Sequence, residues 1–305
     1  DGEGFAKKGV ILVTINYRVN VFGFFAHPDL EAENKEGVSG NYGILDQIFA
    51  LNWVKENISA FGGDPEKVTV AGQSAGCMSV QAIISSPLSQ GLLRGAILQS
   101  GGGIGALHTT PGKEALWDVS KKLMEHLGVS TLEELRKVPS LELRDAAYAV
   151  QGQGLRWCPH VDGWLLSDNT DALAEKGAIH DIPYMIGSTG DDIGGEALLQ
   201  DAGARFCQNQ LKLGRKPGYF YFFNRKLPGD NAGAFHSCEL WYEFETLPRC
   251  WRPWEDCDWE LAKAVSGYWA NFVKTGDPNG EGLPLWTPFT QNQQNPMVLA
   301  DTVAM

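Results

Sequence analysis

The stretch of sequence that decides the fold is Val68-Thr-Val-Ala-Gly-Gln-Ser-Ala-Gly76. It starts as a short aliphatic run, continues as Gly-x-Ser-x-Gly, and leads into a helix-like segment at residues 78–85. A serine between two glycines, placed between a buried strand and a helix, is typical of a sharp turn that lifts the serine hydroxyl above the end of a sheet. We expect both Gly72 and Gly76 to be required, because side chains at either position would clash with the crossing backbone.

This serine turn (residues 72–76) predicts a catalytic nucleophile at Ser74. The backbone N–H of Ala75, at the start of the following helix, would point toward the oxygen of a bound carbonyl and serve as one oxyanion-hole donor. The preceding residue, Gln73, is a candidate pocket residue. A glycine-rich turn without catalytic function is the alternative interpretation of the same pattern.

A serine hydroxyl needs a general base, and the base needs an acid that orients it. In folds with this turn, the chain order is serine, acid, histidine. His236 fits best, because it lies in a loop of small residues twelve positions after a strand-like run that ends at Asn224. The remaining histidines are interpreted as solvent-facing or capping residues: His27, His108, His126, His160 and His180.

The candidate acids directly follow another strand-like run, in Gly187-Ser-Thr-Gly-Asp-Asp192. Because the carboxyl ends of parallel strands meet at one edge of a sheet, these carboxylates would reach the imidazole of His236. Adjacent side chains point to different sides, so only one of Asp191 and Asp192 can orient the histidine. The residues alone leave that choice open.

Strand-like and helix-like segments alternate along the chain, which predicts an α/β fold with a mostly parallel central sheet and helices on both faces. A strand covered on both faces is expected at residues 10–15. Ser130 with Glu133 predicts a helix-capping box. We expect one domain over residues 1–305, with a helical excursion at about 105–180. The remaining strand-like runs are 67–71, 96–98, 184–186 and 219–223, and helical periodicity marks 41–58, 116–127 and 261–272.

Composition excludes several classes of protein. The 305 residues include 37 acidic and 25 basic side chains, and the formal charge of −12 disfavours a nucleic-acid partner. No apolar run is long enough to span a membrane, and no cluster of residues suggests a metal or an organic cofactor. The six cysteines are interpreted as free thiols, with a bridge between Cys250 and Cys257 as the alternative. The oligomeric state is not indicated.

The chain starts at Asp1 without Met or a secretory leader. We therefore expect an N-terminally incomplete sequence of a soluble protein, with the cytoplasm favoured as its compartment.

The sequence resembles the type-B carboxylesterases of the α/β-hydrolase fold, which include cholinesterases and bacterial para-nitrobenzyl esterases. The resemblance covers residues 5–300 and implies that Ser74 is the nucleophile, His236 the base and Asp192 the acid. It also implies hydrolysis of small to medium carboxylic esters through an acyl-enzyme, without a cofactor. Besides the serine turn, it rests on Asn16-Tyr-Arg18, Phe22-Gly-Phe24, Gly40-Asn-Tyr-Gly43, Asp46-Gln47, Phe61-Gly-Gly-Asp-Pro65, Val161-Asp-Gly163 and residues 269–278.

The sequence departs from the family pattern at the acid, where the family usually has glutamate. Asp191 and Glu196 therefore stay as alternatives to Asp192. The serine turn carries Gln73 where glutamate is common. The interval of 44 residues between Asp192 and His236 is compact, so we expect some helices near the pocket to be absent.

By the same resemblance, Arg18 is expected to pair with Asp46 beneath the serine turn. The family takes its other oxyanion donors from a His-Gly-Gly-rich loop upstream of the first strand, and these 305 residues contain no such motif. One donor contributes roughly 3–4 kcal/mol of transition-state stabilisation. We expect the chain alone to be weakly active or inactive unless a further segment supplies those donors.

Aromatic residues and acids near the histidine allow more than one interpretation. Trp157 and Trp241 are candidate pocket residues, although packing on the sheet is the default role of the tryptophans. The dense acids of residues 239–260 are interpreted as a solvated face, with attraction of cationic esters as the alternative. Two rival functions are a non-catalytic adhesion or scaffolding protein on the same fold, and an esterase for feruloyl or acetyl groups of plant polysaccharide.

Overall fold

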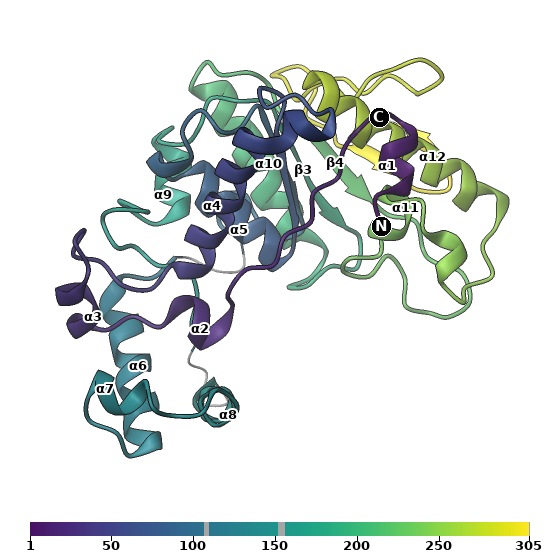
Figure 1. Cartoon of the computed structure of the whole chain (residues 1–305). Coiled ribbons are helices and arrows are strands. Elements are labelled where there is room, and N and C mark those ends of the chain that lie inside the picture. The colour runs from purple at the N-terminus through teal and green to yellow at the C-terminus, as the bar shows by residue number, and fades with distance from the viewer. Residues whose placement is uncertain (107–109, 152–155, 305) are drawn as a thin grey trace.

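The computed structural model describes residues 1–106, 110–151 and 156–304, and leaves the side chain of Glu196 undescribed. In that part of the chain one sheet of six strands forms the centre of the molecule, in the order β1-β2-β3-β4-β5-β6 (Figure 1). Strands β1 to β5 run parallel and β6 is antiparallel, which confirms the predicted mostly parallel sheet. The strands are β1 (Thr69–Gln73), β2 (Gly95–Gln99), β3 (Tyr184–Thr189), β4 (Tyr219–Phe223), β5 (Met297–Leu299) and β6 (Val303–Ala304).

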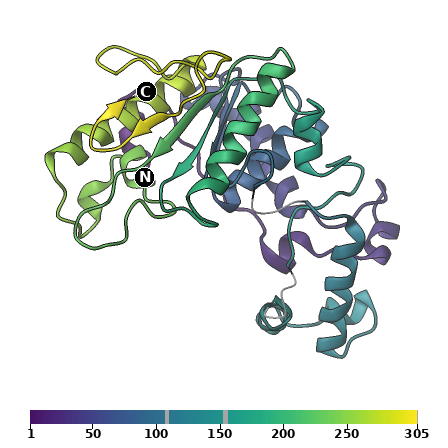
Figure 2. The same ribbon diagram turned by 180° about the vertical axis from the view of Figure 1, so that it is seen from behind.

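Helices cover both faces of this sheet, as the two views in Figures 1 and 2 show. The helices are α1 (Glu3–Lys7), α2 (Asn20–Phe24), α3 (Pro28–Glu33), α4 (Tyr42–Asn57), α5 (Ala75–Ile84), α6 (Lys113–Leu127), α7 (Leu132–Leu135), α8 (Ser140–Gln151), α9 (Thr170–Glu175), α10 (Glu196–Lys212), α11 (Leu240–Glu243) and α12 (Asp256–Thr275). Short 3-10 turns lie at Ile58–Phe61, Pro87–Ser89 and Leu247–Arg249.

Alternating side chains on the strands divide the core into two layers. On β2, Leu98 belongs to the cluster that α4, α5 and α10 cover, whereas Ile97 packs with α11 and α12. On β3, Ile186 and Met185 divide between the same two clusters. This alternation follows from the two-residue period of a strand. Because β1 to β4 run parallel, their carboxyl ends lie along one edge of the sheet.

The prediction of a buried strand at residues 10–15 is wrong. These residues lie outside the sheet, and Ile11, Val13 and Ile15 are 45%, 41% and 39% exposed. Aliphatic, β-branched sequence favours a strand, but a strand also needs a hydrogen-bonded partner. No described strand lies beside residues 10–15 or along the outer edge of β1.

Two smaller expectations about helices can be compared with the structure. The capping box lies one residue later than expected. The Thr131 side chain accepts the N–H of Glu134, and the Glu134 carboxylate accepts the N–H of Thr131. The helical periodicity at 261–272 lies within α12, which is capped by Gly276 at a φ of 79° that glycine adopts without strain. Between β2 and β3, α6, α7 and α8 form a lobe at the lower left of Figure 1, away from the sheet.

Two general properties of the described residues bear on function. No described helix is long and apolar enough to cross a bilayer. All six cysteines are free thiols, so Cys250 and Cys257 do not form the bridge that was considered.

Candidate active site

The serine turn joins β1 to α5 in the strained geometry that its sequence predicts. Ser74 has φ 58° and ψ −122°, a positive φ that is rare for a residue with a side chain. A Cβ on Gly72 would lie 2.3 Å from the carbonyl oxygen of Gly76, so Gly72 is required. The expectation for Gly76 is wrong, because a Cβ there would meet nothing within 4 Å outside its own helix. The crossing backbone therefore excludes a side chain at Gly72 but not at Gly76.

This asymmetry gives a matched pair of variants. Gly72→Ala is expected to lower the free energy of unfolding by about 1–3 kcal/mol, because the added methyl group has to displace backbone. Gly76→Ala is expected to leave it unchanged or to raise it by up to about 1 kcal/mol, because alanine favours a helix over glycine. Urea unfolding followed by circular dichroism measures both values, and equal losses in the two variants would contradict the geometry.

The structure brings Asp192 to His236. Asp192 Oδ1 lies 2.5 Å from His236 Nδ1, and the side chain of Asp192 is almost fully buried. The backbone N–H groups of Thr189 and Ile193 donate to the same carboxylate at 3.0 and 2.8 Å. Asp192 is thus held by its own loop in a position to orient the imidazole, with the proton on Nδ1.

The neighbouring Asp191 has a different environment. It accepts hydrogen bonds from Lys226 Nζ and from the backbone N–H of Ala234, both at 2.7 Å. The hydrogen bond from Lys226 lowers the pKa of the Asp191 carboxyl below its ordinary value. Asp191 therefore anchors the loop that carries His236 and does not contact the imidazole. The side chain of Glu196, the other alternative, lies outside the described residues.

The second nitrogen of the imidazole faces the serine turn. His236 Nε2 lies 3.2 Å from Nε2 of Gln73, the residue before Ser74. With Nδ1 protonated toward Asp192, Nε2 is an acceptor, and the amide of Gln73 donates to it. The hydroxyl of Ser74 makes no hydrogen bond with any described residue. Ala75 begins α5, so its N–H belongs to the first turn of the helix, where backbone donors lack helical partners.

The two tryptophans considered for the pocket lie in different places. Trp157 is buried in the core on the side of α4 and α5. Trp241 packs beside the His236 loop, with its ring centroid 5.9 Å from that of Phe235 and 6.2 Å from that of Trp254. Of the two, only Trp241 adjoins the candidate catalytic residues.

The other histidines have structural contacts. His27 caps α3, accepting the N–H of Asp29. His160 is buried and contacts the carbonyl of Ser39 at 3.0 Å, and burial lowers its pKa. His180 lies 2.8 Å from the hydroxyl of Ser89. Thus His160 is a core residue, not a solvent-facing one. His126 lies on α6, and His108 falls outside the described residues.

The expected pair of Arg18 and Asp46 is confirmed. The guanidinium donates to both carboxylate oxygens, at 2.8 and 2.7 Å. Arg18 is about half exposed, so the pair lies at the surface next to α4 and not beneath the serine turn.

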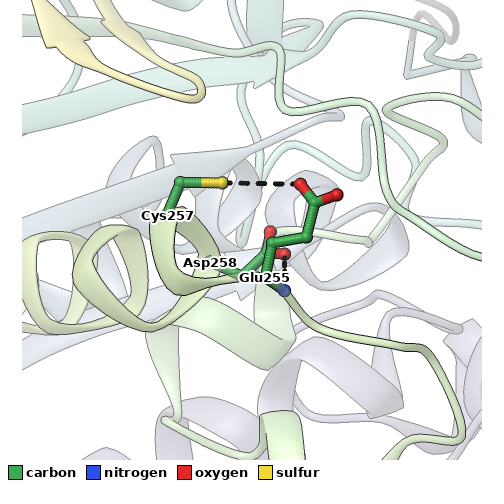
Figure 3. Close-up of side chains that lie close together, drawn as sticks. All are labelled: Glu255, Cys257 and Asp258. Carbon is green, nitrogen blue, oxygen red and sulfur yellow. Dashed lines mark hydrogen bonds between the residues drawn. The ribbon is translucent and has the colours of Figure 1, made fainter.

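One cluster in the described residues has the composition of a metal site. Glu255, Cys257 and Asp258 converge at the start of α12, as Figure 3 shows. Arg225 already neutralises this cluster, because its guanidinium donates to Glu255 Oε2 and to Asp258 Oδ1, each at 2.7 Å. The positively charged guanidinium of Arg225 therefore already lies between these carboxylates, and the cluster does not fit a metal ion.

Two buried acids were missed by the interpretation of residues 239–260 as a solvated face. Glu239 and Glu243 are 1% and 3% exposed. Neither carboxylate oxygen of Glu239 has a hydrogen-bond partner among the described residues. Burial raises the pKa of Glu239 to about 8 and that of Glu243 to about 7. Their spacing of four residues around an apolar Leu-Trp-Tyr run was the available signal for one buried helix face.

The raised pKa of Glu239 makes stability depend on pH. Because the folded state holds this proton up to about pH 8 and the unfolded state releases it near its ordinary value of 4.5, stability declines as pH rises between these values. Glu239→Gln is expected to flatten that decline and to be more stable than the wild type by on the order of 2 kcal/mol at pH 9. At pH 4 the advantage should vanish. Urea unfolding across this pH range measures it, with the exposed Glu260→Gln as a control.

A parallel sheet that carries a serine turn, with an acid and a histidine on the loops after β3 and β4, defines an α/β-hydrolase. The chain belongs to the carboxylesterase family, whose family model matches residues 1–211 and 203–304. The two matches meet inside α10, within the interval between Asp192 and His236 that was expected to be compact.

Known relatives and solved structures agree with this assignment. Carboxylesterase 5A of Felis catus is 30% identical over 96% of this chain and 66% of its own length. The para-nitrobenzyl esterase of Bacillus subtilis is 30% identical over the whole chain and 72% of its own length. A PNB esterase structure aligns with a TM-score of 0.86 at 28% identity, covering this whole chain and 73% of that one. The chain thus spans about two thirds of the length of the carboxylesterase 5A sequence.

Proposed function

We propose that the protein is a serine hydrolase of carboxylic esters. The observation that carries this proposal is the contact of 2.5 Å between Asp192 and His236, on a loop whose imidazole faces the turn of Ser74. Family membership supports the same conclusion, because the relatives are named as esterases. An adhesion or scaffolding role does not require this arrangement.

The proposed reaction has two steps. Ser74 Oγ attacks the ester carbonyl while His236 Nε2 takes its proton, and Asp192 stabilises the imidazolium. The backbone N–H of Ala75 donates to the developing oxyanion. The bond to the alcohol breaks, and the alcohol leaves with the proton from His236. Water then attacks the acyl-enzyme while His236 takes its proton. The bond between the acyl carbon and Ser74 Oγ breaks, His236 returns the proton to Oγ, and the acid is released.

Small and medium esters are the proposed substrate class, as the names of the relatives suggest. A para-nitrobenzyl esterase and a carboxylesterase align over nearly the whole chain. The fumonisin B1 esterase of Sphingopyxis macrogoltabida is 39% identical, but over only 63% of this chain and 35% of its own length. We therefore favour a general carboxylesterase over an esterase dedicated to polysaccharide side groups.

Labelling with a fluorophosphonate probe tests the function. The serine oxygen displaces fluoride from phosphorus and forms a stable covalent adduct, so the reaction reports an activated serine without requiring turnover. We expect one label per chain, on the peptide that contains Ser74, as determined by mass spectrometry. Absence of labelling, or labelling at another residue, would overturn the proposal.

We further propose that additional oxyanion donors come from a segment outside these 305 residues. The open outer edge of β1 supports this, as does a groove of about 470 Å³ lined by Val13, Ile15, Phe49 and Trp53. Phe49 is 74% exposed there, so the groove offers an apolar surface to a further strand.

Hydrolysis of p-nitrophenyl acetate tests this second proposal. With the donor of Ala75 alone, the chain is expected to turn over at least about 100-fold more slowly than the Bacillus subtilis para-nitrobenzyl esterase measured alongside it. Equal turnover by the two proteins would contradict the proposal that further oxyanion donors lie outside these residues.

A further inference from the structure

A buried hydrogen bond links β2 to α11 behind the candidate site. Gln99 ends β2 and lies opposite Gln73 in the sheet register. Its backbone carbonyl accepts the N–H of Ser74 at 2.8 Å, so β2 holds the serine turn directly. Its side-chain Nε2 donates to Oε2 of Glu243 at 2.9 Å. One residue therefore contacts both the serine turn and the helix that follows the histidine.

Glu243 connects this bond to the other half of the site. It is the last residue of α11, which starts four residues after His236, and the N–H of Leu240 bonds back to the carbonyl of Ser237. Together with the bond from the N–H of Glu243 to the carbonyl of Glu239, this backbone bond holds the segment between Ser237 and Glu243 together. Any shift of Glu243 relative to Gln99 would move the imidazole relative to Ser74.

The hydrogen bond between Gln99 and Glu243 is buried, so its geometry is closely constrained. Gln99 and Glu243 are 2% and 3% exposed, so water cannot replace either partner. Burying a carboxyl group disfavours folding unless a specific contact compensates for it, and the raised pKa of Glu243 reflects that burial. The contact made by Glu243 is the one to Gln99, which points to a role in placing the two elements.

We propose that Glu243 is a positioning residue, which sets the separation of the His236 loop and the Ser74 turn through its hydrogen bond to Gln99. This inference rests on the proposed function. It requires no contact between Glu243 and substrate. A displacement of about 1 Å at reacting atoms lowers a rate by about 100-fold, so a small shift of this link has a measurable effect.

The rate constant for fluorophosphonate labelling of Ser74 in the full chain tests the role. Glu243→Leu removes the acceptor and is expected to slow labelling by 10- to 100-fold, on the order expected for a displacement of that size. Glu243→Gln keeps an amide oxygen that accepts from Gln99 and is expected to stay within about threefold of the wild type, since the hydrogen bond is retained.

A reversal of donor and acceptor separates positioning from general destabilisation. Gln99→Glu alone adds a carboxyl group to the buried pair of Glu239 and Glu243 and is expected to label slowly. Adding Glu243→Gln restores the bond in the opposite direction and is expected to recover most of the rate. Tyr242→Phe is the matched control, because it removes another buried bond of α11, from the Tyr242 hydroxyl to Asp258 Oδ1 at 2.7 Å. It is expected to lower the melting temperature without slowing labelling.

The outcomes distinguish this inference from the proposed function. Labelling of Glu243→Leu at the wild-type rate, or of Glu243→Gln as slowly as Glu243→Leu, would overturn the positioning role alone. Should Glu243→Leu fail to fold, the reversal pair decides, and no recovery in the double variant overturns the role. A wild-type chain that is not labelled at Ser74 would overturn the proposed function and this inference together.

Discussion

Replacing Ser74 with alanine is expected to abolish labelling by fluorophosphonate and to lower ester hydrolysis by about 10⁴-fold or more. The turn holds Ser74 at φ 58°, with the acceptor nitrogen of His236 beside the preceding residue. Alanine has no Oγ, so the turn no longer carries an oxygen that can attack the ester carbonyl or the phosphorus of the probe. Covalent labelling and p-nitrophenyl acetate hydrolysis measure the two effects.

A second serine on the same helix serves as the control. Ser79 lies on α5 and accepts a hydrogen bond from Gln47 Nε2 at 3.2 Å. Ser79→Ala is expected to keep the wild-type labelling rate while losing a small amount of stability. Esterase turnover that survived in Ser74→Ala would rule out the acyl-enzyme mechanism.

Asp192→Asn is expected to lower the labelling rate and hydrolysis by about 10⁴-fold. The carboxylate of Asp192 accepts from His236 Nδ1 and from two backbone N–H groups. An asparagine amide has only one acceptor oxygen, so its NH₂ group must face one of these donors. Facing the imidazole, it moves the ring proton to Nε2, which then cannot take the proton of Ser74.

Asp191→Asn is the adjacent control. The asparagine oxygen can still accept from the N–H of Ala234, and the lost ion pair with Lys226 is exposed. We expect less than a tenfold loss in the labelling rate, with circular dichroism confirming that both variants fold. Equal losses in Asp191→Asn and Asp192→Asn would contradict the assignment of the acid.

Much of the fold and of the candidate site could be predicted from local sequence patterns. Strands β1 to β4 were predictable because each is a short apolar run, aliphatic in β1 to β3 and aromatic in β4. The serine turn was predictable because its glycines lie directly between β1 and α5. His236 was predictable from its position after β4. The choice of Asp192 over Asp191 required the resemblance, because both residues occupy the same loop and only their side-chain directions differ.

The features that sequence could not predict depend on distant neighbours. Residues 10–15 have strand-forming side chains, but a strand forms only where a second segment lies beside it and pairs with its backbone. The burial of Glu243 depends on β2, which lies more than 140 residues earlier in the chain. Helix α10 was not predicted, although Leu199 and Phe206 bury one of its faces against the sheet. The space for a side chain at Gly76 depends on how neighbouring segments are arranged around the folded turn.

The unpaired segment at residues 10–15 and the open edge of β1 also govern how concentrated solutions of this chain behave. Exposed strand edges with aliphatic side chains favour intermolecular β-pairing. The net charge of −12 opposes association through mutual repulsion, which added salt screens. The chain should therefore stay monodisperse in dilute buffer and form larger particles as sodium chloride increases. Dynamic light scattering along a salt titration records this change, and particle size that does not depend on salt would contradict it.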